Sequence, residues 1–581
     1  MSLLSTSSKP SNFSCWIGLL LAINLLVNNH QVSLWDEDEA AYAGFAQEMV
    51  ETGNWVTPSY PQSVIHRKTP LHFWAIGGSY QLFGENEFAV RFSSALAIFL
   101  TCLLIFWGTR TWLGTTTAER AAVILATSIQ LPLMGKIAFT DATLLLFETG
   151  AVIGLLRYLQ APNWRWNTLL WGSMALGILT KGPPIIVLTG GLWLLLAVFH
   201  PERKRLIGTH PWIFGVVALL PFAYWAWLSY QQDYALWNAS ASSLPFGEWW
   251  DQAASDGRKI YLLPFLWDWY VLKRVGGAVL GQSGFLGYHF VILTIAFLTW
   301  LPLWPKTLHA LGRGIRGRTD LEQRPLILWV VIGWFFWELM SSKLPSYAMG
   351  AQPALALLMA LQLKELEEQT TLPKSVQIGL WIHGGLFLSI SLGLPIAGFY
   401  IFGTQALWYL LPMSTVLFVL LLRLWRSEKK LINIYQQLAV FGGSFMLGLW
   451  LCVAPLLEQS PIKSFDNLIE VAAQATTIPE ETTLLLTGLD LKQFKISLVF
   501  YAQQTFGSYK TGSPEEAFAK FQSKERVVLI IGTVGIEQLK ERFAAANLPF
   551  EATKVAHQST DDQLRRHDYW VLSNTKKSNS F

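Results

Sequence analysis

Long apolar stretches recur along most of this chain, and they constrain its fold more than any other feature. They run from Cys15 to Leu457, and several of them are about 20 residues long. A helix that crosses a bilayer needs that length, because hydrocarbon offers no water to satisfy backbone polar groups. The composition agrees, since 52% of the residues are hydrophobic and only 14% are charged. The sequence therefore predicts a multi-span α-helical membrane protein.

About 13 candidate transmembrane helices can be delimited by this criterion. They cover residues 15–34, 92–112, 120–137, 142–160, 167–180, 183–199, 211–230, 284–304, 325–341, 346–363, 377–402, 405–424 and 433–457. Basic residues concentrate in alternate connections, as in Arg203-Lys204-Arg205, and the positive-inside rule places those connections in the cytoplasm. The longer segments 35–91 and 231–283 and the C-terminal region then lie on the outer face. We expect a multi-pass membrane protein.

The first outer segment carries two amphipathic helical patterns. In residues 39–52 apolar side chains repeat at helical spacing, namely those of Tyr42, Phe45, Ala46, Met49 and Val50. Residues 70–83 begin with Pro70, which suits a first helical turn, and are followed by Gly84. We expect both patterns to form interfacial helices that roof the mouth of the bundle.

The character of the chain changes after Leu457, where charge returns and long apolar runs stop. Three apolar, β-prone runs and two helical patterns follow. The runs are 482–487, 527–531 and 568–572, and the helical patterns are 514–522 and 536–545. Such a mixture predicts a layered α/β domain. The expected organisation is a transmembrane domain over residues 1–457, with its interfacial helices at about 39–83, and a soluble extracytoplasmic α/β domain over 458–581.

Composition excludes several kinds of partner and cofactor. The net charge is +4, and no Lys/Arg-rich tract with interleaved aromatics indicates nucleic-acid binding. Cys15, Cys102 and Cys452 all lie in apolar segments, so they predict neither a disulfide framework nor a metal site. We expect no cofactor and no metal. The first apolar run lacks a small-residue cleavage site, so we expect it to be retained as a span.

An acidic run, Asp36-Glu37-Asp38-Glu39, opens the first amphipathic pattern. Acidic residues at a helix N-terminus complement the helix dipole, and this structural interpretation could explain the run by itself. The functional interpretation is a carboxylate that acts as a general base towards a hydroxyl nucleophile. The two interpretations are compatible, and both stay open at this point.

Charged residues also cluster near the predicted outer ends of the spans. His66-Arg67-Lys68 separates the two amphipathic patterns, and its cations could contact lipid phosphates or fix a phosphodiester leaving group. The same face is predicted to hold one further acid and five further cations, Asp141, Lys136, Lys181, Lys343, Lys273 and Arg274. Each alone could be a snorkelling or loop residue, but together they suit an anionic lipid substrate.

The placement of these charges bears on the class of function. Transporters usually hold polar groups near the bilayer midplane, in broken helices. Here the predicted charges gather at one interface, which favours an enzyme at the membrane surface. A flippase or transporter of a lipid-linked saccharide is the alternative. A non-catalytic scaffold whose soluble tail binds a partner is a third interpretation.

Several short motifs follow one another in a characteristic order along the membrane part. They are Asp38-Glu39-Ala40-Ala41-Tyr42-Ala43, Gly53-Asn54-Trp55-Val56-Thr57-Pro58, Lys68-Thr69-Pro70-Leu71-His72-Phe73-Trp74, residues 82–91, Thr140-Asp141, residues 179–183 and residues 342–347. The series resembles the polytopic lipid-sugar-dependent glycosyltransferases, the family of the lipid A aminoarabinose transferase, which is akin to the protein mannosyltransferases.

The resemblance implies a membrane-embedded C-type glycosyltransferase that transfers a sugar, with inversion, from a polyprenyl-phosphate carrier. The acceptor would be a lipid, glycan or protein hydroxyl or phosphate group. A protein O-glycosyltransferase is the runner-up within this class. The phosphate leaves already ionised, so the reaction requires no metal. The enzyme is expected to act as a monomer among the lipids of a bacterial inner (plasma) membrane, with its active site on the extracytoplasmic side.

The resemblance also assigns roles to individual residues. Asp38 would be the general base of the catalytic pair Asp38 and Glu39. The carrier phosphate would be bound by Lys68, Arg274 and Lys343. The cavity would be lined by Tyr42, Asp141, Lys181 and Tyr347.

Three positions depart from the family pattern. Ala41 stands where relatives often carry Arg, Arg67 replaces the usual Glu before the phosphate lysine, and Thr69 replaces a Pro. The residues beyond about 458 match no family motif. These departures leave the donor sugar open.

Overall fold

The structure is a computed structural model in which the chain forms two compact units. It describes residues 10–35, 38–58, 60, 68–239, 262–267, 271–272, 277, 283–317, 323–367, 369, 371–426, 431–458, 466–489, 496–523, 525–558 and 566–574. The first unit, here called the bundle unit, comprises Met1–Asn29, Asn54–Thr57 and Arg67–Val453. The second, the sheet unit, comprises His30–Gly53, Pro58–His66 and Ala454–Phe581.

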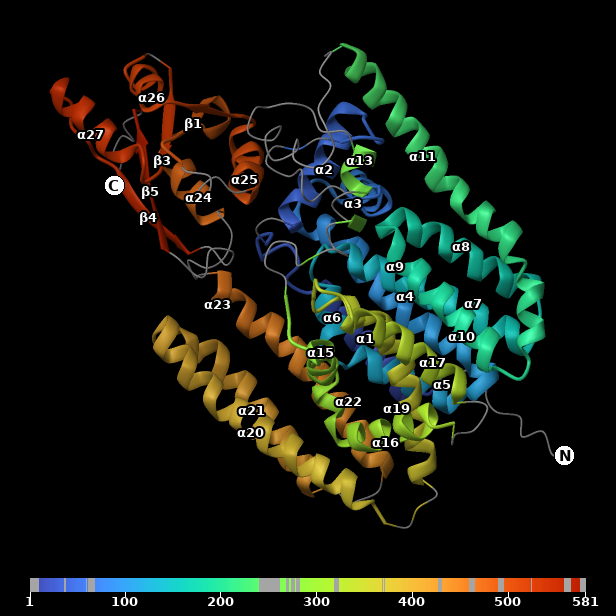
Figure 1. Cartoon of the computed structure of the whole chain (residues 1–581). Coiled ribbons are helices and arrows are strands. Elements are labelled where there is room, and N and C mark those ends of the chain that lie inside the picture. The colour runs from blue at the N-terminus through green and yellow to red at the C-terminus, as the bar shows by residue number, and fades with distance from the viewer. Residues whose placement is uncertain are drawn as a thin grey trace. The chain divides into compact units, whose positions relative to one another are not determined.

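The bundle unit is built from helices (Figure 1). Its first half contains α1 (Asn12–Leu26), α3 (Leu71–Phe83), α4 (Glu87–Leu113), α5 (Thr115–Ala126), α6 (Gln130–Met134), α7 (Thr140–Gln160), α8 (Trp164–Lys181), α9 (Pro183–Ile185), η2 (Ile186–Gly190), α10 (Gly191–Phe199), η3 (Arg203–Thr209) and α11 (Pro211–Ala239). Its second half contains α13 (Leu262–Trp267), α15 (Tyr288–Ala296), η6 (Leu298–Leu303), α16 (Trp304–Ile315), α17 (Arg324–Val330), η7 (Val331–Phe335), α18 (Phe336–Glu338), η8 (Tyr347–Ala351), α19 (Gln352–Glu367), α20 (Lys374–Phe402), α21 (Gln405–Arg426), α22 (Leu431–Gly448) and η9 (Leu449–Val453).

Six helices among the described residues are long and apolar enough to cross a membrane. They are Glu87–Leu113, Thr140–Gln160, Pro211–Gln232, Lys374–Phe402, Gln405–Arg426 and Leu431–Glu458. A seventh span results if α15 and the segment Leu298–Ile315, which meet at 99°, count as one. Pro302 and the non-helical backbone of Trp300 lie just beyond this bend. Each remaining predicted span coincides with a shorter or interrupted helix, so the number thirteen stays a prediction.

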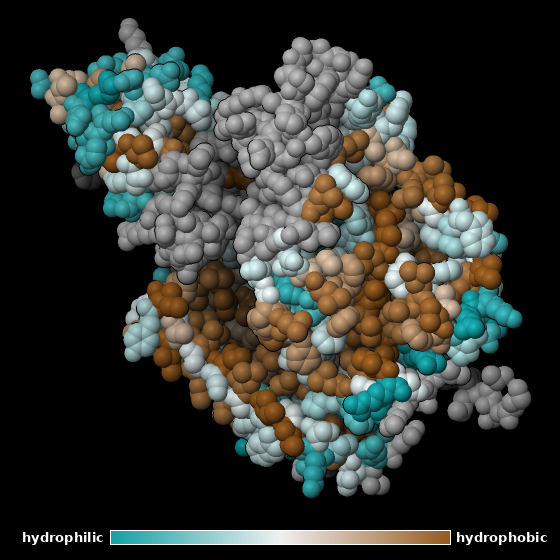
Figure 2. All heavy atoms as spheres, viewed as in Figure 1, coloured by the Kyte–Doolittle hydropathy of each residue, from teal (hydrophilic) through white to brown (hydrophobic). Residues whose placement is uncertain are grey.

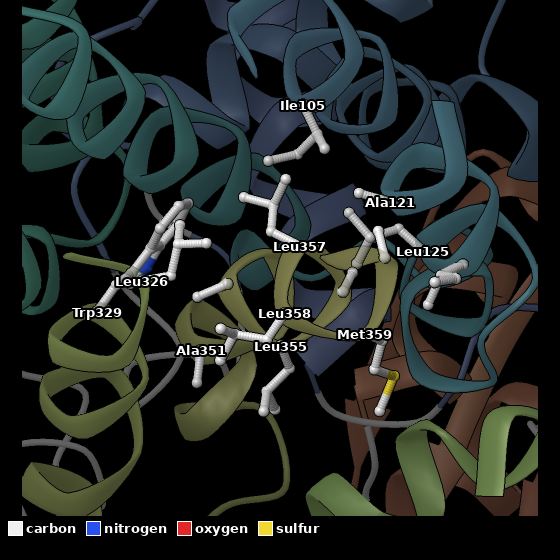
Figure 3. Close-up of a cluster of buried hydrophobic side chains, with 14 of the residues drawn as sticks. Ile105, Ala121, Leu125, Leu326, Trp329, Ala351, Leu355, Leu357, Leu358 and Met359 are labelled. Carbon is white, nitrogen blue, oxygen red and sulfur yellow. The ribbon is translucent and has the colours of Figure 1, made fainter. Parts of the chain in front are cut away.

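The core of the bundle unit is centred on α19, which is apolar on all sides. Its residues from Gln352 to Leu363 are buried, as expected for a helix without a polar face. Figure 3 shows Leu355, Leu357, Leu358 and Met359 of this helix among side chains from neighbouring helices. By contrast α11, α20 and α21 expose large hydrophobic side chains, and Figure 2 shows such side chains over much of the visible face of the bundle. These exposed faces suit contact with lipid.

The sheet unit contains a five-stranded mixed sheet with helices on both faces (Figure 1). Its elements are α2 (Asp38–Thr52), α23 (Ala454–Glu458), α24 (Asp466–Gln474), η10 (Pro479–Glu481), β1 (Thr483–Thr487), α25 (Ile496–Phe506), β2 (Tyr509–Gly512), α26 (Pro514–Phe521), β3 (Val527–Ile531), α27 (Ile536–Ala545), β4 (Thr553–Gln558) and β5 (Arg566–Ser573). The strand order is β2-β1-β3-β5-β4, with β1 parallel to β2 and β3 and with β5 antiparallel to β3 and β4.

The structure confirms the strands predicted at 482–487, 527–531 and 568–572 and the two helices predicted between them. The strands β2 and β4 were not predicted, because both lie at edges of the sheet and lack the continuous apolar run of a buried strand. The helical pattern at 39–52 forms α2, and its predicted apolar face is buried except for Val50, which is half-buried. Helix α2 packs against α25 within the sheet unit, an arrangement that periodicity alone could not indicate.

Candidate functional site

An ion pair joins two neighbouring helices of the bundle unit. Asp141 lies in the first turn of α7 and Lys181 is the last residue of α8. These helices follow one another along the chain and pack together, so the start of one meets the end of the other. The Lys181 Nζ atom lies 2.7 Å from Asp141 Oδ1, and each side chain is 13% exposed. The structure therefore brings together two residues that the sequence placed at one face.

Tyr347 lies at the same place. Its ring centroid is 5.7 Å from Lys181 Nζ, a cation–π distance, and Tyr347 begins the short helix η8. The same ring stacks on His289, with centroids 6.5 Å apart. The backbone of Gly182 has a φ of 77°, so the chain can reverse directly after Lys181. Lys181 thus ends at a turn with a carboxylate and an aromatic face beside its ammonium group.

A pocket of about 270 Å³ opens at this ion pair. Lys68 and Lys181 contribute the charged groups of its wall, next to Thr69. The rest of the wall is apolar apart from a glycine, and it consists of Ile178, Gly182, Pro183, Ile186, Leu219, Phe222, Leu263, Leu266, Trp267 and Val271. A cavity with two cations and long apolar walls is complementary to an amphiphile that carries an anionic group.

His72 anchors the helix that follows Lys68. The imidazole is fully buried on α3, with Nε2 3.2 Å from the carbonyl oxygen of Ala138 and Nδ1 3.2 Å from Thr143 Oγ1. Burial lowers the pKa of His72 from 6.5 to about 4, so the ring is neutral at pH 7. Because a carbonyl can only accept, Nε2 carries the proton and Nδ1 accepts from Thr143. The ring fixes α3 to the start of α7. Sequence reasoning assigned His72 no role, although it lies within one of the motifs.

Lys343 belongs to a different ionic cluster of the bundle unit. Its Nζ donates to the carbonyl oxygen of Glu338 at 2.6 Å and lies 3.8 Å from Glu338 Oε2. The same carboxylate oxygen is 2.9 Å from Nδ1 of His289, whose Nε2 lies 3.2 Å from the carbonyl oxygen of Leu344. The side chains of Lys343, Glu338 and His289 are all buried. Lys343 is not among the residues that line the Lys68–Lys181 pocket.

Sequence reasoning missed two members of this cluster, Glu338 and His289. Both lie in apolar helical segments that were predicted to span the membrane. An ionisable residue within a span is costly and usually functional or paired, and that signal could have identified them. Lys136, another predicted outer cation, is also buried. It donates to Asn29 Oδ1 at 2.9 Å and lies over the ring of Trp450.

In the sheet unit the acidic run opens helix α2. Tyr42 donates its hydroxyl proton to Asp38 Oδ1 at 2.9 Å, one turn along the same helix. Glu39 is fully buried, and its Oε2 accepts from the backbone N–H of Trp35 at 2.8 Å. Asp38 lies at the first position of the helix. Glu39 therefore binds the backbone just before the helix, and the Asp38 carboxylate accepts a hydrogen bond from a hydroxyl group.

The remaining predicted residues lie outside the part of the chain that the structure describes. They are Arg274 and its neighbour Lys273, together with Asp36, Glu37, His66 and Arg67. Among the described residues, no group of three or more His, Cys, Asp or Glu side chains could hold a metal ion.

The membrane part of the chain is similar to known proteins. A family model described as dolichyl-phosphate-mannose-protein mannosyltransferase matches residues 67–227. The undecaprenyl phosphate-alpha-4-amino-4-deoxy-L-arabinose arabinosyl transferase of Yersinia pestis (strain Pestoides F) is 28% identical over 333 residues, or 56% of this chain and 55% of that protein. The corresponding transferase 2 of Proteus mirabilis (strain HI4320) is 26% identical and shares 59% of this chain and 58% of its own. The chain thus spans about half the length of these curated relatives.

The fold also has a counterpart among solved structures. ArnT from Cupriavidus metallidurans bound to undecaprenyl phosphate superposes with a TM-score of 0.66, over 97% of this chain and 99% of that chain, at 18% identity. Its apo state gives a TM-score of 0.65. At this identity the likeness shows a shared fold. The resemblance to polytopic glycosyltransferases that the motifs indicated is confirmed in sequence and in fold.

Proposed function

We propose that the protein transfers a sugar, with inversion, from a polyprenyl-phosphate carrier to a hydroxyl or phosphate acceptor on the outer face of the inner membrane. The pocket lined by Lys68 and Lys181 carries this proposal. Its two cations match a phosphodiester anion, and its apolar walls match an isoprenoid chain. The relatives support the choice of carrier, since the arabinosyl transferases are named for undecaprenyl phosphate and ArnT was crystallised bound to it.

The two lysines would stabilise the leaving group. As the bond between the anomeric carbon and the phosphate oxygen breaks, the phosphate gains negative charge. Cations that already lie at that position lower the barrier without reorganising. Lys181 is suited to this role because Asp141 and Tyr347 hold its ammonium at the pocket wall. Arg274 stays a further proposed phosphate ligand. Lys343 was also predicted to bind the phosphate, but its pairing with Glu338 away from this pocket favours a structural role.

Asp38 would act as the general base. In the proposed step an acceptor oxygen forms a bond to the anomeric carbon from the face opposite the phosphate, and its proton passes to the Asp38 carboxylate. The carrier leaves as a phosphate monoester, so one inversion occurs and no covalent intermediate forms. The hydrogen bond from Tyr42 would orient the carboxylate. The proposed site also includes Glu39 as the second catalytic carboxylate. Its cavity would be lined by Tyr42, Asp141 and Tyr347.

The choice of acceptor and the topology are further parts of the proposal. The acceptor class comprises lipids, glycans and proteins, and the departures at Ala41, Arg67 and Thr69 concern the donor sugar. Thirteen spans with the N-terminus inside would place Asp38 and residues 458–581 outside the cytoplasm. Basic residues in the alternate loops support that orientation. A monomer is the simplest active form of this arrangement.

The proposal is tested by following the carrier. Purified protein, incubated with a polyprenyl-phosphate sugar and an envelope lipid extract, should release free polyprenyl phosphate. Asp38→Asn should reduce kcat by about 10²- to 10⁴-fold, because the variant keeps the size of the side chain but not the base. Full turnover by Asp38→Asn would show that another group is the base. Mass spectrometry of envelope lipids and glycans from a deletion strain would identify the sugar and the acceptor.

A further inference from the structure

Helix α25 of the sheet unit is buried on all sides over its first two turns. Every residue from 496 to 502 is buried. A helix on one face of a sheet normally exposes its outer side, which is why surface helices are amphipathic. Here β1, β2 and α24 cover one part of α25, and α2 covers another. The helix that carries Asp38 is therefore packed into the core of the C-terminal α/β layers, although more than 400 residues separate the two in sequence.

Three polar contacts fix the segment around α2 to the C-terminal layers. The first is made by Tyr501, a buried residue of α25. Its hydroxyl oxygen accepts from the backbone N–H of Leu34 at 2.7 Å, four residues before Asp38. Leu34 has no exposed surface, so water cannot replace this acceptor. Tyr501 thus determines where the chain enters the first turn of α2.

The second contact runs through Tyr60. Its ring lies so close to Gly44 in the middle of α2 that a Cβ atom there would overlap the ring. Its hydroxyl donates to Gln503 Oε1 of α25 at 2.7 Å. Burial raises the pKa of Tyr60, so the phenol stays protonated and remains a donor. Tyr60 therefore connects the backbone of α2 to α25.

The third contact involves Glu458, the last residue of α23. Its carboxylate accepts from the backbone N–H of Ser33 at 3.2 Å and from the Ser33 hydroxyl. The contacts at Ser33, Leu34 and Gly44 lie on both sides of Asp38 in the sequence. A backbone held on both sides of Asp38 keeps the direction in which its side chain leaves the helix, which a general base requires.

We propose that the C-terminal α/β layers position the Asp38 carboxylate for catalysis, with Tyr501, Gln503 and Glu458 as positioning residues. The inference rests on the proposed function, in which Asp38 is the base. It assigns a role to a region for which the sequence offered no motif. Removing one contact should misdirect the carboxylate while the pocket for the carrier stays intact, so kcat should fall and the KM for the donor should not change.

The first test does not depend on activity. Hydrogen–deuterium exchange of the full-length protein in detergent is measured for Tyr501→Phe, Gln503→Leu and the matched control Phe543→Leu. Phe543 lies in the core on the opposite face of the sheet, among α26 and α27. The proposal expects exchange in residues 38–46 to accelerate at least about ten-fold in the first two variants. The control should keep wild-type protection there. Unchanged protection in both contact variants would overturn the proposal.

The second test uses turnover of a polyprenyl-phosphate sugar. Tyr501→Phe and Gln503→Leu should lower kcat by about 10- to 100-fold with an unchanged KM for the donor, whereas Phe543→Leu should retain kcat below its unfolding temperature. The double variant Tyr60→Phe, Gln503→Leu should have the same kcat as either single variant. Each substitution removes the same hydrogen bond, the one between Tyr60 and Gln503, so the second removes nothing further. Wild-type kcat in the contact variants, despite faster exchange in α2, would overturn the positioning role. If the wild-type protein releases no carrier, the proposed function fails, and the exchange experiment still decides whether α25 holds α2.

Discussion

At the scale of single residues, Lys181 is the centre of the candidate site. It contacts a carboxylate and an aromatic ring and also lines the pocket. Asp141 compensates the cost of holding an ammonium group with little exposure, and it fixes the rotamer of a long side chain. The ammonium group of Lys181 is therefore preorganised, because its position is fixed before an anion binds. Such electrostatic preorganisation is usually the largest contribution to the stabilisation of a transition state by an enzyme.

Removal of the charge of Lys181 should weaken carrier binding. We expect the double variant Lys181→Met, Asp141→Asn to bind polyprenyl phosphate about ten-fold less tightly, because a charge-assisted hydrogen bond contributes about 1.5–3 kcal/mol. The double variant leaves no carboxylate unpaired, which a single change at Lys181 would do. Binding is measured by titration of the detergent-solubilised protein.

Lys343 provides the matched comparison. Its ammonium pairs with Glu338 rather than lining the pocket. The variant Lys343→Met, Glu338→Gln should lose thermal stability and keep the affinity for polyprenyl phosphate. An equal loss of affinity in the two double variants would instead support Lys343 as a ligand of the carrier phosphate.

The buried imidazole of His72 should make the free energy of unfolding depend on pH. Its folded pKa of about 4 lies below its ordinary value of 6.5, so the unfolded state binds the proton more readily. The stability that neutral His72 contributes is complete above pH 6.5 and is lost as the pH falls towards 4. The total effect is about 3 kcal/mol. His72→Gln should be less stable at pH 7 but should lack this part of the acid dependence. Thermal unfolding between pH 7 and pH 4 checks it, and parallel curves for the two proteins would contradict it.

At the scale of elements, the turn between α8 and α9 controls where Lys181 points. Gly182 has a φ of 77° and open space where a Cβ would lie, so only backbone strain opposes a side chain there. Gly172, within α8, also has open space but an ordinary helical backbone. Steric overlap is absent at both glycines, so a difference between their alanine variants reports the backbone conformation.

Gly182→Ala should destabilise the protein by about 1–2 kcal/mol and weaken carrier binding, because the turn must change to accept a Cβ. Gly172→Ala should stabilise it by about 0.5–1 kcal/mol, since Ala favours a helix. Thermal unfolding and carrier titration of the two variants test the pair. Equal effects at both positions would show that the turn is not strained.

At the scale of the whole molecule, the open question is how many helices cross the membrane. The six long apolar helices, or seven with the bent pair, account for about half of the predicted spans. The others are short or interrupted, as at Thr127-Ser128 between α5 and α6 and at η2 between α9 and α10. Interrupted helices can still cross a bilayer where neighbouring protein satisfies their backbone.

Thirteen spans make a specific prediction about sidedness. In a variant without native cysteines, Thr404→Cys, in the turn between α20 and α21, should react with an impermeant maleimide added outside spheroplasts. Lys204→Cys, in η3, should react only after the membrane is opened, because thirteen spans place this basic loop in the cytoplasm. Reaction of both residues from the same side would contradict the predicted topology.

Hydrophobic periodicity and the length of apolar runs are local properties of the chain. The sequence by itself therefore determined the structural features that follow from these two properties. It located the apolar helices, the buried face of α2 and the central strands of the sheet, and its ordered motifs identified the type of enzyme that the chain resembles. It also placed Asp141 and Lys181 at one face, because two adjacent antiparallel helices leave no other choice for their ends.

Only the tertiary structure decided which charges meet. The sequence placed Lys181 and Lys343 at the same outer face, and the resemblance made Lys343 the phosphate ligand of the two. In the structure Lys181 faces Asp141 at a pocket, whereas Lys343 is buried against Glu338. Likewise the periodicity of α2 showed that one face is apolar, but not that the helix packs against α25. Such pairings depend on contacts between residues that are far apart in the sequence. The free energy of those contacts comes from shape and burial in the packed molecule, which no local pattern encodes.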